Sequence, residues 1–117
     1  MNVAAATVAA FVAGGAYYAV LGSQLGGADE RMPPWKLAVE VLRCVILAAV
    51  VAGLAARADI DDFTGGLLLG LALWVGFPLV LWIGAVIHAS EPVRLALVHG
   101  GDWLLKLVLV GVIVAIA

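Results

Sequence analysis

The sequence predicts an all-α polytopic membrane protein whose four transmembrane helices are arranged as two antiparallel hairpins. Apolar residues make up 66% of the 117 residues and charged residues 12%, about half of the roughly 25% that is usual in soluble globular domains. Four apolar stretches are each long enough to cross a hydrocarbon core about 30 Å thick. Ten of the fourteen charged side chains fall outside these stretches, where membrane helices meet water.

The four predicted spans account for most of the chain, so we expect one transmembrane domain over residues 1–117. The spans are expected at residues 3–25, 37–56, 65–89 and 95–117. The first span has no Lys or Arg before its apolar run, whereas secretory signal peptides begin with a positively charged region. We therefore expect the first span to remain in the mature protein.

The connections carry the helix-breaking and polar residues. Pro33 and Pro34 end the first connection, and Trp35 follows as an expected interfacial anchor. Three aspartates lie in the second connection, residues 57–64. The third connection has about five residues around Glu91, so spans three and four must form a tight antiparallel pair.

The basic residues predict the orientation in the membrane. One side of the membrane, that of the first and third connections, has four: Arg31, Lys36, Arg43 and Arg94. The other side has only Arg57. Because Lys and Arg are enriched in cytoplasmic loops, we expect the first and third connections in the cytoplasm and both termini outside, in the cell inner (plasma) membrane.

Several function classes are excluded by composition and motifs. A net charge of −2 gives no electrostatic footprint for nucleic acid. The single cysteine, Cys44, excludes an internal disulfide and a multi-cysteine metal site. The histidines lack the HExxH spacing, and phosphate-binding loops, dinucleotide fingerprints and nucleophile elbows are missing from the sequence. We therefore predict no catalytic residues, no metal and no cofactor.

Charged residues inside the second and fourth spans form the candidate site. The second span has a polar stripe of residues three and four apart: Lys36, Glu40 and Arg43. The fourth span repeats this spacing with His99, Asp102 and Lys106. Lys106 lies roughly 17 Å along its span, where a charge costs at least about 2.5 kcal/mol even on the gentlest scale. We therefore expect both stripes to turn inward and to form a neutral polar cluster of Glu40, Arg43, His99, Asp102 and Lys106. This cluster is interpreted either as a structural set of ion pairs that fixes helix register or as a wet cytoplasmic-side cavity that conducts or binds a solute; contact with a partner subunit or a lipid headgroup is the third interpretation.

The first span presents a smooth face that ends in polar groups. At 100° per residue this face contains Ala6, Ala10, Ala13, Tyr17 and Gln24. Gly22-x-x-x-Gly26 and Gly66-x-x-x-Gly70 have the spacing that lets helices approach closely. Packing within the chain is the favoured interpretation of both, and a dimer contact is the alternative. Tyr17 and Gln24 are accessory candidates for the polar cluster.

Interruptions in the third and fourth spans supply the other accessory candidates. Gly100-Gly101 is expected to loosen the fourth helix, and Pro78 removes the helical donor of the Trp74 carbonyl. In a regular helix one face of the third span would contain Trp74, Phe77, Pro78, Leu81, Ala85 and His88. His88 is expected at the membrane interface, and proton handling with His99 is the alternative.

A shift of 58 residues aligns the two halves of the chain. It places Pro34, Leu37, Ala38 and Gly53 on Pro92, Leu95, Ala96 and Gly111. A sequence dominated by Ala, Val, Leu and Gly also matches itself by chance. The sequence therefore leaves open whether the chain is a parallel repeat of two-helix units.

Three stretches carry a family resemblance. They are Met1-Asn2 followed by Gly14-Gly15-Ala16-Tyr17-Tyr18, then Leu73-Trp74-Val75-Gly76-Phe77, and finally the run from Pro92 to Leu105. Over nearly its whole length the chain resembles the small prokaryotic, bacterial-type four-helix membrane proteins catalogued as domain of unknown function seventeen-sixty-one. The resemblance implies the fold and the membrane location, but no activity. The family more often has an aromatic residue at the position of Asp102 and Asn at that of His99, and its first connection is commonly longer.

These observations lead to three functional hypotheses. We expect permeation or transport of protons, a small ion or a small polar solute past the polar cluster, in a homo-oligomer such as a dimer because four helices enclose little space. The alternative is a non-catalytic accessory or interaction subunit of a larger membrane complex. The third is a membrane-embedded enzyme that acts on lipid, with His99 and Asp102 at a lateral opening and Ser23 as nucleophile. Permeation requires a hydrated Asp102, whereas an accessory subunit allows a dry, paired one.

Overall fold

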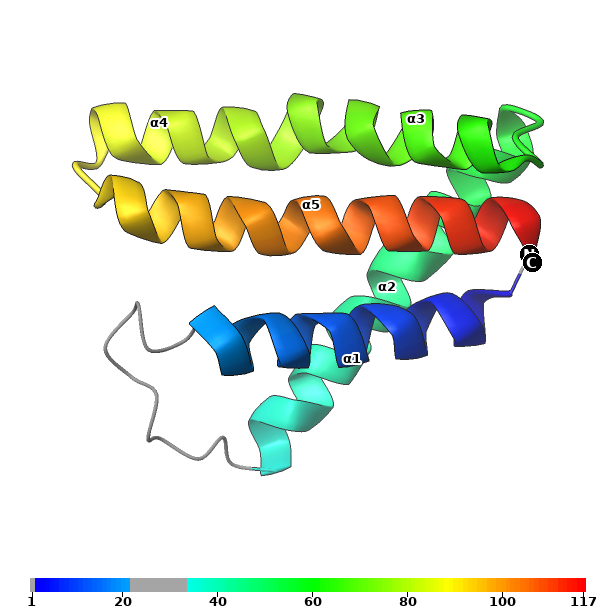
Figure 1. The fold of residues 1–117 in the computed structure, drawn as a ribbon, viewed down its shortest axis with the longest axis horizontal. Helices are drawn as coiled ribbons and strands as arrows, with labels where there is room; N and C mark the ends of the chain where they lie inside the picture. The colour runs from blue at the N-terminus through cyan, green and yellow to red at the C-terminus, as the bar shows by residue number, and fades with distance from the viewer. Residues whose placement is uncertain (1, 22–33) are drawn as a thin grey trace.

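The computed structural model describes residues 2–21 and 34–117, and almost all of these residues are helical (Figure 1). The elements are α1 (Val3–Leu21), α2 (Pro34–Arg57), α3 (Phe63–Trp74), the π-helical segment η2 (Val75–Leu79), α4 (Val80–His88) and α5 (Val93–Ile116). Elements α3, η2 and α4 form one continuous span, so the described residues contain four helices long and apolar enough to cross a membrane. The predicted all-α class with four membrane-length helices is confirmed.

The helix boundaries agree with the predicted spans to within three residues where both are described. The largest difference is at α2, which begins at Pro34 and not at residue 37. Proline is tolerated in the first helical turn because an N–H there has no intrahelical acceptor. Residues 22–25 of the first predicted span lie outside the described residues, as do Gln24 and the Gly22-x-x-x-Gly26 spacing.

Aspartates form the tight connection between α2 and α3. Asp59 has a φ of 55°, and the next N–H, that of Ile60, donates to the Ala55 carbonyl at 2.9 Å. This left-handed residue with a 6→1 hydrogen bond is the Schellman arrangement that ends many helices. Asp62 then caps α3 by accepting from the Gly65 N–H at 2.8 Å. In the acidic second connection, Asp59 therefore helps to end α2 and Asp62 begins α3.

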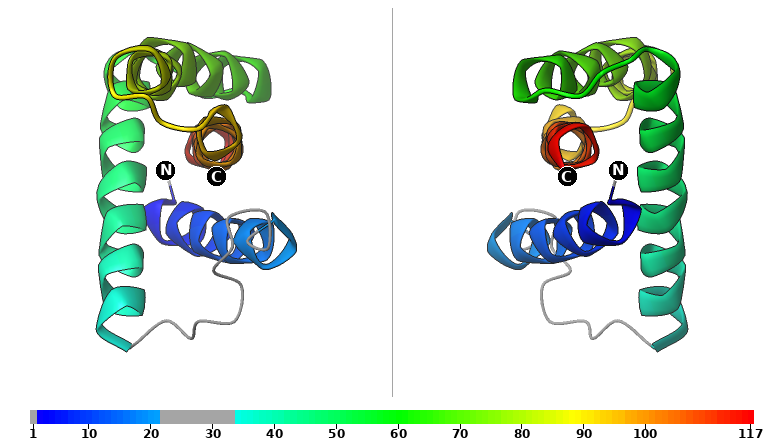
Figure 2. Two further views of the ribbon diagram at one scale, coloured as in Figure 1. Left: turned by 90° about the vertical axis from the view of Figure 1, so that its left-hand side faces the viewer. Right: turned by 90° about the vertical axis from the view of Figure 1, so that its right-hand side faces the viewer.

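Helix α5 lies at the centre of the bundle. In Figures 1 and 2 the α3–α4 span lies along one side of α5, α1 lies along the opposite side, and α2 crosses this stack obliquely. Helix α5 contacts α1, α2 and α3. The α3–α4 span and α5 run antiparallel side by side, but α2 crosses α1 and does not run alongside it. The predicted arrangement as two hairpins is therefore not confirmed.

Glycines bring α3 and α5 into backbone contact. A Cβ added at Gly66 would lie 2.5 Å from the Gly111 carbonyl oxygen, and one at Gly70 would lie 2.5 Å from the Leu107 carbonyl oxygen. Such close approach maximises van der Waals contact where lipid removes the hydrophobic driving force between helices. The favoured interpretation of Gly66-x-x-x-Gly70, packing within the chain, is confirmed.

Small residues also form the core where α1 and α2 meet α5. The fully or almost fully buried apolar residues are Ala6 and Ala10 of α1, Cys44, Ala48, Val51, Ala52 and Ala55 of α2, and Leu107, Val110 and Val114 of α5. The smooth face predicted for the first span is the face that packs inward, since Ala6 and Ala10 have no exposed surface. Apart from the buried Val51, this packing leaves larger apolar side chains of α2 such as Leu42, Ile46 and Val50 exposed, as suits a helix that faces lipid.

Candidate functional site: a polar cavity between four helices

The two predicted polar stripes meet at one cavity. A cavity of about 620 Å³ lies between α1, α2, α4 and α5. All five residues of the predicted polar cluster line it, together with Gly14, Tyr18, Trp82 and Trp103 among others. Lys36, the first residue of the α2 stripe, is exposed and its ammonium lies 5.5 Å from the ring centroid of Trp35. The tertiary structure therefore gathers charges from α2 and α5 that are about 60 residues apart in the sequence.

Asp102 and Lys106 form a buried ion pair within α5. Lys106 Nζ lies 3.0 Å from Asp102 Oδ2, and their side chains are 8% and 3% exposed. Asp102 Oδ1 is also buried and accepts no hydrogen bond from the described residues. Backbone of α1 covers the pair, because a Cβ added at Gly14 would lie 2.7 Å from Lys106 Cε and 3.4 Å from Asp102 Oδ1. The pair thus forms the closed inner wall of the cavity.

Glu40 and Arg43 form a second ion pair, which is more open. Arg43 Nη1 donates to Glu40 Oε1 within α2, and the Arg43 side chain is 52% exposed. Both partners of each ion pair therefore come from the same helix, α2 for one pair and α5 for the other. The two positive and two negative charges balance within these pairs. The Trp103 ring lies near both cations, with its centroid 6.0 Å from Arg43 Cζ and 5.8 Å from Lys106 Nζ. Distances of this size allow cation–π attraction.

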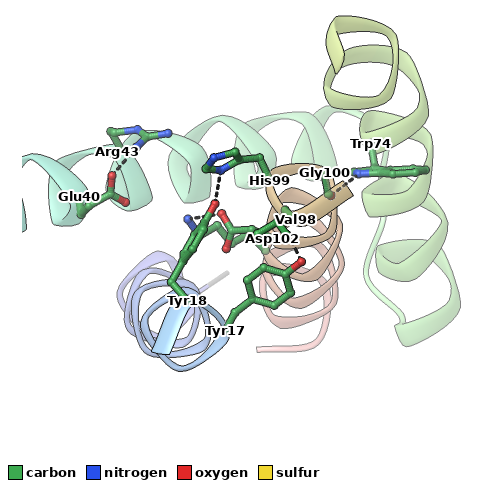
Figure 3. Close-up of polar contacts among 10 residues, drawn as sticks. Tyr17, Tyr18, Glu40, Arg43, Trp74, Val98, His99, Gly100 and Asp102 are labelled. Atoms are coloured by element: carbon green, nitrogen blue, oxygen red, sulfur yellow. Dashed lines mark hydrogen bonds and ion pairs between the residues drawn. The ribbon is translucent and has the colours of Figure 1, made fainter. Parts of the chain in front are cut away.

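His99 is held by aromatic residues from two other helices. The Tyr18 hydroxyl lies 2.5 Å from His99 Nδ1, and the Trp82 ring stacks on the imidazole with centroids 5.3 Å apart and planes 7° apart. Figure 3 shows Tyr17 and Tyr18 of α1 pointing toward α5, on the side of His99 and Asp102. This clamp fixes the imidazole at the cavity wall. The hydrogen-bond partner of the His99 imidazole is therefore Tyr18 and not Asp102, because Asp102 pairs with Lys106.

Two further side chains hold the backbone of α5 beside His99. The Tyr17 hydroxyl donates to the Val98 carbonyl at 2.7 Å, and Trp74 Nε1 donates to the Gly100 carbonyl at 2.8 Å (Figure 3). Gly100-Gly101 does not interrupt the fourth span, since α5 is continuous from Val93 to Ile116. Gly101 instead leaves space for Tyr17, whose hydroxyl would collide with a Cβ at that position.

Pro78 changes the hydrogen-bond pattern of the third span without breaking it. The proline is buried inside η2, and a π-helical turn admits one extra residue into a helix. The expected shared face of Trp74 and Leu81 is therefore wrong: Trp74 and Trp82 turn toward α5, and Leu81 is 68% exposed. Pro78 does not line the polar cavity.

The remaining accessory candidate of the third span lies apart from the cavity. His88 is the last residue of α4 and is exposed. It is not among the residues that line the cavity with His99. Among the described residues, groups of three or more His, Cys, Asp or Glu that could hold a metal ion do not occur.

Sequence reasoning missed eight of the residues that line the cavity, among them Gly14, Tyr18, Trp82 and Trp103. Gly14 and Tyr18 each adjoin residues that were considered, and Trp103 lies three positions before Lys106 on the same helix face. Proximity to these candidate residues was the signal in the sequence that could have identified Gly14, Tyr18 and Trp103. Trp82 lies four positions after Pro78, and residues at this spacing share a face of a regular helix, so Pro78 was its available signal.

The fold and the site together define a class: small four-helix proteins of membrane type with an ion-paired polar cavity between the helices. The family model described as Protein of unknown function (DUF1761) matches residues 1–115. The chain therefore belongs to the DUF1761 family, which confirms the resemblance stated above. No curated protein and no solved structure matches the chain.

Proposed function

We propose that this protein is a permeation protein that moves a proton, a small ion or a small polar solute through the membrane by way of the polar cavity. The observation that carries the proposal is that both intramembrane charge stripes line one cavity of about 620 Å³. Charges placed deep in a membrane are costly, and cavity walls in transport proteins are where such residues commonly lie.

The buried ion pair would act as the closed end of this path. Arg43 and His99 lie at the more open part of the cavity, whereas Asp102 and Lys106 are sealed under Gly14 of α1. A solute that goes further must displace Lys106 from Asp102 or move between them. Two local ion pairs leave the cavity neutral, and the mutual attraction within each pair offsets part of the cost of taking its charges out of water.

The orientation and assembly are part of the proposal. The first and third connections would face the cytoplasm, with both termini outside the plasma membrane, because Lys and Arg concentrate beside those connections. The start of α1 and the end of α5 lie at one end of the bundle in Figure 1, as an even number of crossings requires. A homo-oligomer would complete the path, since among the described residues the Arg43 side chain at the cavity is 52% exposed.

A second candidate, a non-catalytic accessory subunit of a membrane complex, is favoured by one observation. Asp102 and Lys106 are dry and paired, as a structural ion pair would be. Under this alternative the half-exposed Arg43 would contact the partner. A non-catalytic role in either case is supported by the separate partners of His99 and Asp102, which are Tyr18 and Lys106.

Thiol labelling tests the two candidates. In a Cys44→Ala background, we expect the single cysteine of His99→Cys to react rapidly with a membrane-impermeant thiol reagent added from the cytoplasmic side. The matched control is Val50→Cys, because Val50 is 56% exposed but lies outside the polar cavity. Equally slow labelling of both positions in folded protein would overturn permeation by this route and favour the accessory subunit.

Flux measurements then test permeation itself. In liposomes that contain a pH-sensitive or ion-sensitive dye, we expect the wild-type protein to raise flux and Lys106→Met to change it. Flux equal to that of empty liposomes for each class of solute would contradict the proposal. Because Lys106→Met alone is expected to destabilise the protein, the double variant Asp102→Leu with Lys106→Met, which is expected to recover the stability, is measured beside it. A change of flux in both folded variants would support a role of the buried pair on the path.

A further inference from the structure

A second, apolar groove adjoins the polar cavity. It has a volume of about 670 Å³ and is lined by Leu47, Val50 and Leu54 of α2, by Phe77 and Leu81 of the third span, and by Trp103 of α5, among others. We propose that this groove binds one acyl chain of a phospholipid whose zwitterionic headgroup is held by Glu40 and Arg43. This lipid site goes beyond the proposed permeation, since lipid binding requires no flux.

The lining of the groove fits a hydrocarbon chain. The lining side chains are apolar throughout, apart from the indole N–H groups of Trp82 and Trp103. Several of them are open to the outside: Val50 is 56% exposed, Leu54 41%, and Phe77 and Leu81 68% each. From Leu47 to Leu54 the groove follows α2 for roughly 10 Å, which is a large part of one leaflet's share of a core about 30 Å thick.

Charges lie at one end of this groove and not along it. Leu47 and Trp103 line both the groove and a small hollow that also contains Glu40 and Arg43. Arg43 is one helical turn before Leu47 on α2, so the polarity changes from charged to apolar along the helix. A lipid with its headgroup at Glu40 and Arg43 and its chain toward Leu54 has the same order. Because Arg43 lies eight positions after Trp35, roughly 12 Å along the oblique helix α2, this headgroup would be drawn below the level of the interface.

The charged end complements a zwitterionic phosphoethanolamine group. Arg43 carries five N–H donors and uses one nitrogen for Glu40, so donors remain for phosphate oxygens, which guanidinium groups recognise well. Glu40 offers a carboxylate to the ammonium of the headgroup. Trp103 lies 6.0 Å from Arg43 Cζ, where an amphipathic indole suits the junction between headgroup and chain.

The order of charges and apolar residues favours a lipid over a second protein helix. A helix from another chain would pack along α2 by side-chain complementarity and would need no pair of opposite charges at one end. A zwitterionic lipid, in contrast, is complemented by an apolar groove that has a pair of opposite charges at one end. The oblique crossing of α2 in Figures 1 and 2 separates it from the α3–α4 span, and the groove lies between these elements.

Fluorescence quenching tests the site with the full chain in an uncharged alkyl-glycoside detergent. The probe is phosphatidylethanolamine with brominated acyl chains, which quench tryptophan on contact; Trp82 and Trp103 line the groove. We expect saturable quenching at one lipid per chain. Water-soluble glycerophosphoethanolamine is expected not to compete, and brominated diacylglycerol, which lacks the phosphate, is expected to bind about tenfold more weakly.

Two variants separate the headgroup contact from the chain contact. Arg43→Gln is expected to weaken phosphatidylethanolamine binding about tenfold without changing diacylglycerol binding. Val50→Phe fills the groove and is expected to weaken both. The matched control is Val45→Phe, since Val45 is 39% exposed on α2 and does not line the groove. Thermal unfolding of each variant confirms that it is folded.

Four outcomes would overturn the lipid site. They are quenching that never saturates, equal affinity for both brominated lipids, no effect of either variant, or full competition by glycerophosphoethanolamine. If Val50→Phe left lipid binding unchanged but abolished cross-linking between chains, the groove would instead be a contact between copies. Lipid binding without flux would contradict only the permeation proposal, and flux without lipid binding would contradict only the lipid site.

Discussion

Gly14 of α1 lies directly against Lys106 of α5. A Cβ added at Gly14 would be 2.7 Å from Lys106 Cε and 3.2 Å from Nζ, although 92 positions separate the two residues in the sequence. Because the lysine is buried and paired with Asp102, its side chain has little freedom to move aside. The missing side chain of Gly14 is thus what allows α1 to seal the ion pair.

Gly14→Ala is expected to destabilise the protein by about 1–3 kcal/mol, the usual cost of inserting a methyl group into a well-packed site. The matched control is Gly15→Ala, since a Cβ at Gly15 has no neighbour within 4 Å among the described residues. That control should be neutral or more stable by up to about 1 kcal/mol, as Ala is the better helix former. Reversible unfolding in detergent measures both. Equal stability of the two variants would show that α1 does not press on Lys106.

Gly70→Ala is expected to separate α3 from α5. Its Cβ would lie 2.5 Å from the Leu107 carbonyl oxygen, and backbone cannot rotate away as a side chain can. We expect a loss of at least about 2 kcal/mol. Gly84→Ala, whose Cβ would meet nothing within 4 Å among the described residues, serves as the control. Unfolding midpoints in detergent provide the comparison, and a harmless Gly70→Ala would contradict the close α3–α5 contact.

The Asp102–Lys106 pair is expected to behave as a coupled unit. Lys106→Met alone leaves a buried carboxylate and should cost about 3–5 kcal/mol, whereas Asp102→Leu combined with Lys106→Met should recover most of that loss. The single variant leaves both carboxylate oxygens unpaired, because Asp102 Oδ1 already accepts no hydrogen bond from the described residues. A double-mutant cycle of unfolding free energies measures the coupling. Additive losses would mean that the pair is not formed in the membrane.

Tyr18→Phe is expected to release His99 while leaving the fold intact. The variant removes the hydroxyl that lies 2.5 Å from Nδ1, at a cost of about 1 kcal/mol for one hydrogen bond. The ¹⁵N chemical shift of Nδ1 should change in Tyr18→Phe. In Tyr17→Phe it should stay as in the wild type, since the Tyr17 hydroxyl donates to the Val98 carbonyl. The same ¹⁵N spectrum in Tyr18→Phe and wild type would disprove the contact.

The sequence by itself determined the class of fold and, over the described residues, the bounds of the membrane-length helices to within three residues. Hydrophobic length and the placement of charges are local properties, and a helix in lipid must satisfy its own backbone hydrogen bonds within one segment. For the same reason the stripes formed by Glu40 with Arg43 and by Asp102 with Lys106 could be predicted, since residues three and four apart share a helix face. Both ion pairs are of this local kind.

The tertiary structure decided everything that depends on which helix faces which. Helical periodicity places both Leu81 and Trp82 near the face of Pro78, and the structure shows that Trp82, which follows the π-helical turn η2, is the residue that stacks on His99. The absence of a side chain at Gly14 makes room for Lys106, and its absence at Gly101 makes room for Tyr17. Neither glycine is needed for its local backbone conformation. The oblique crossing of α2 places an apolar groove next to the polar cavity. Such crossing angles depend on how the side chains of two helices pack together. The sequence of one span alone therefore does not determine them.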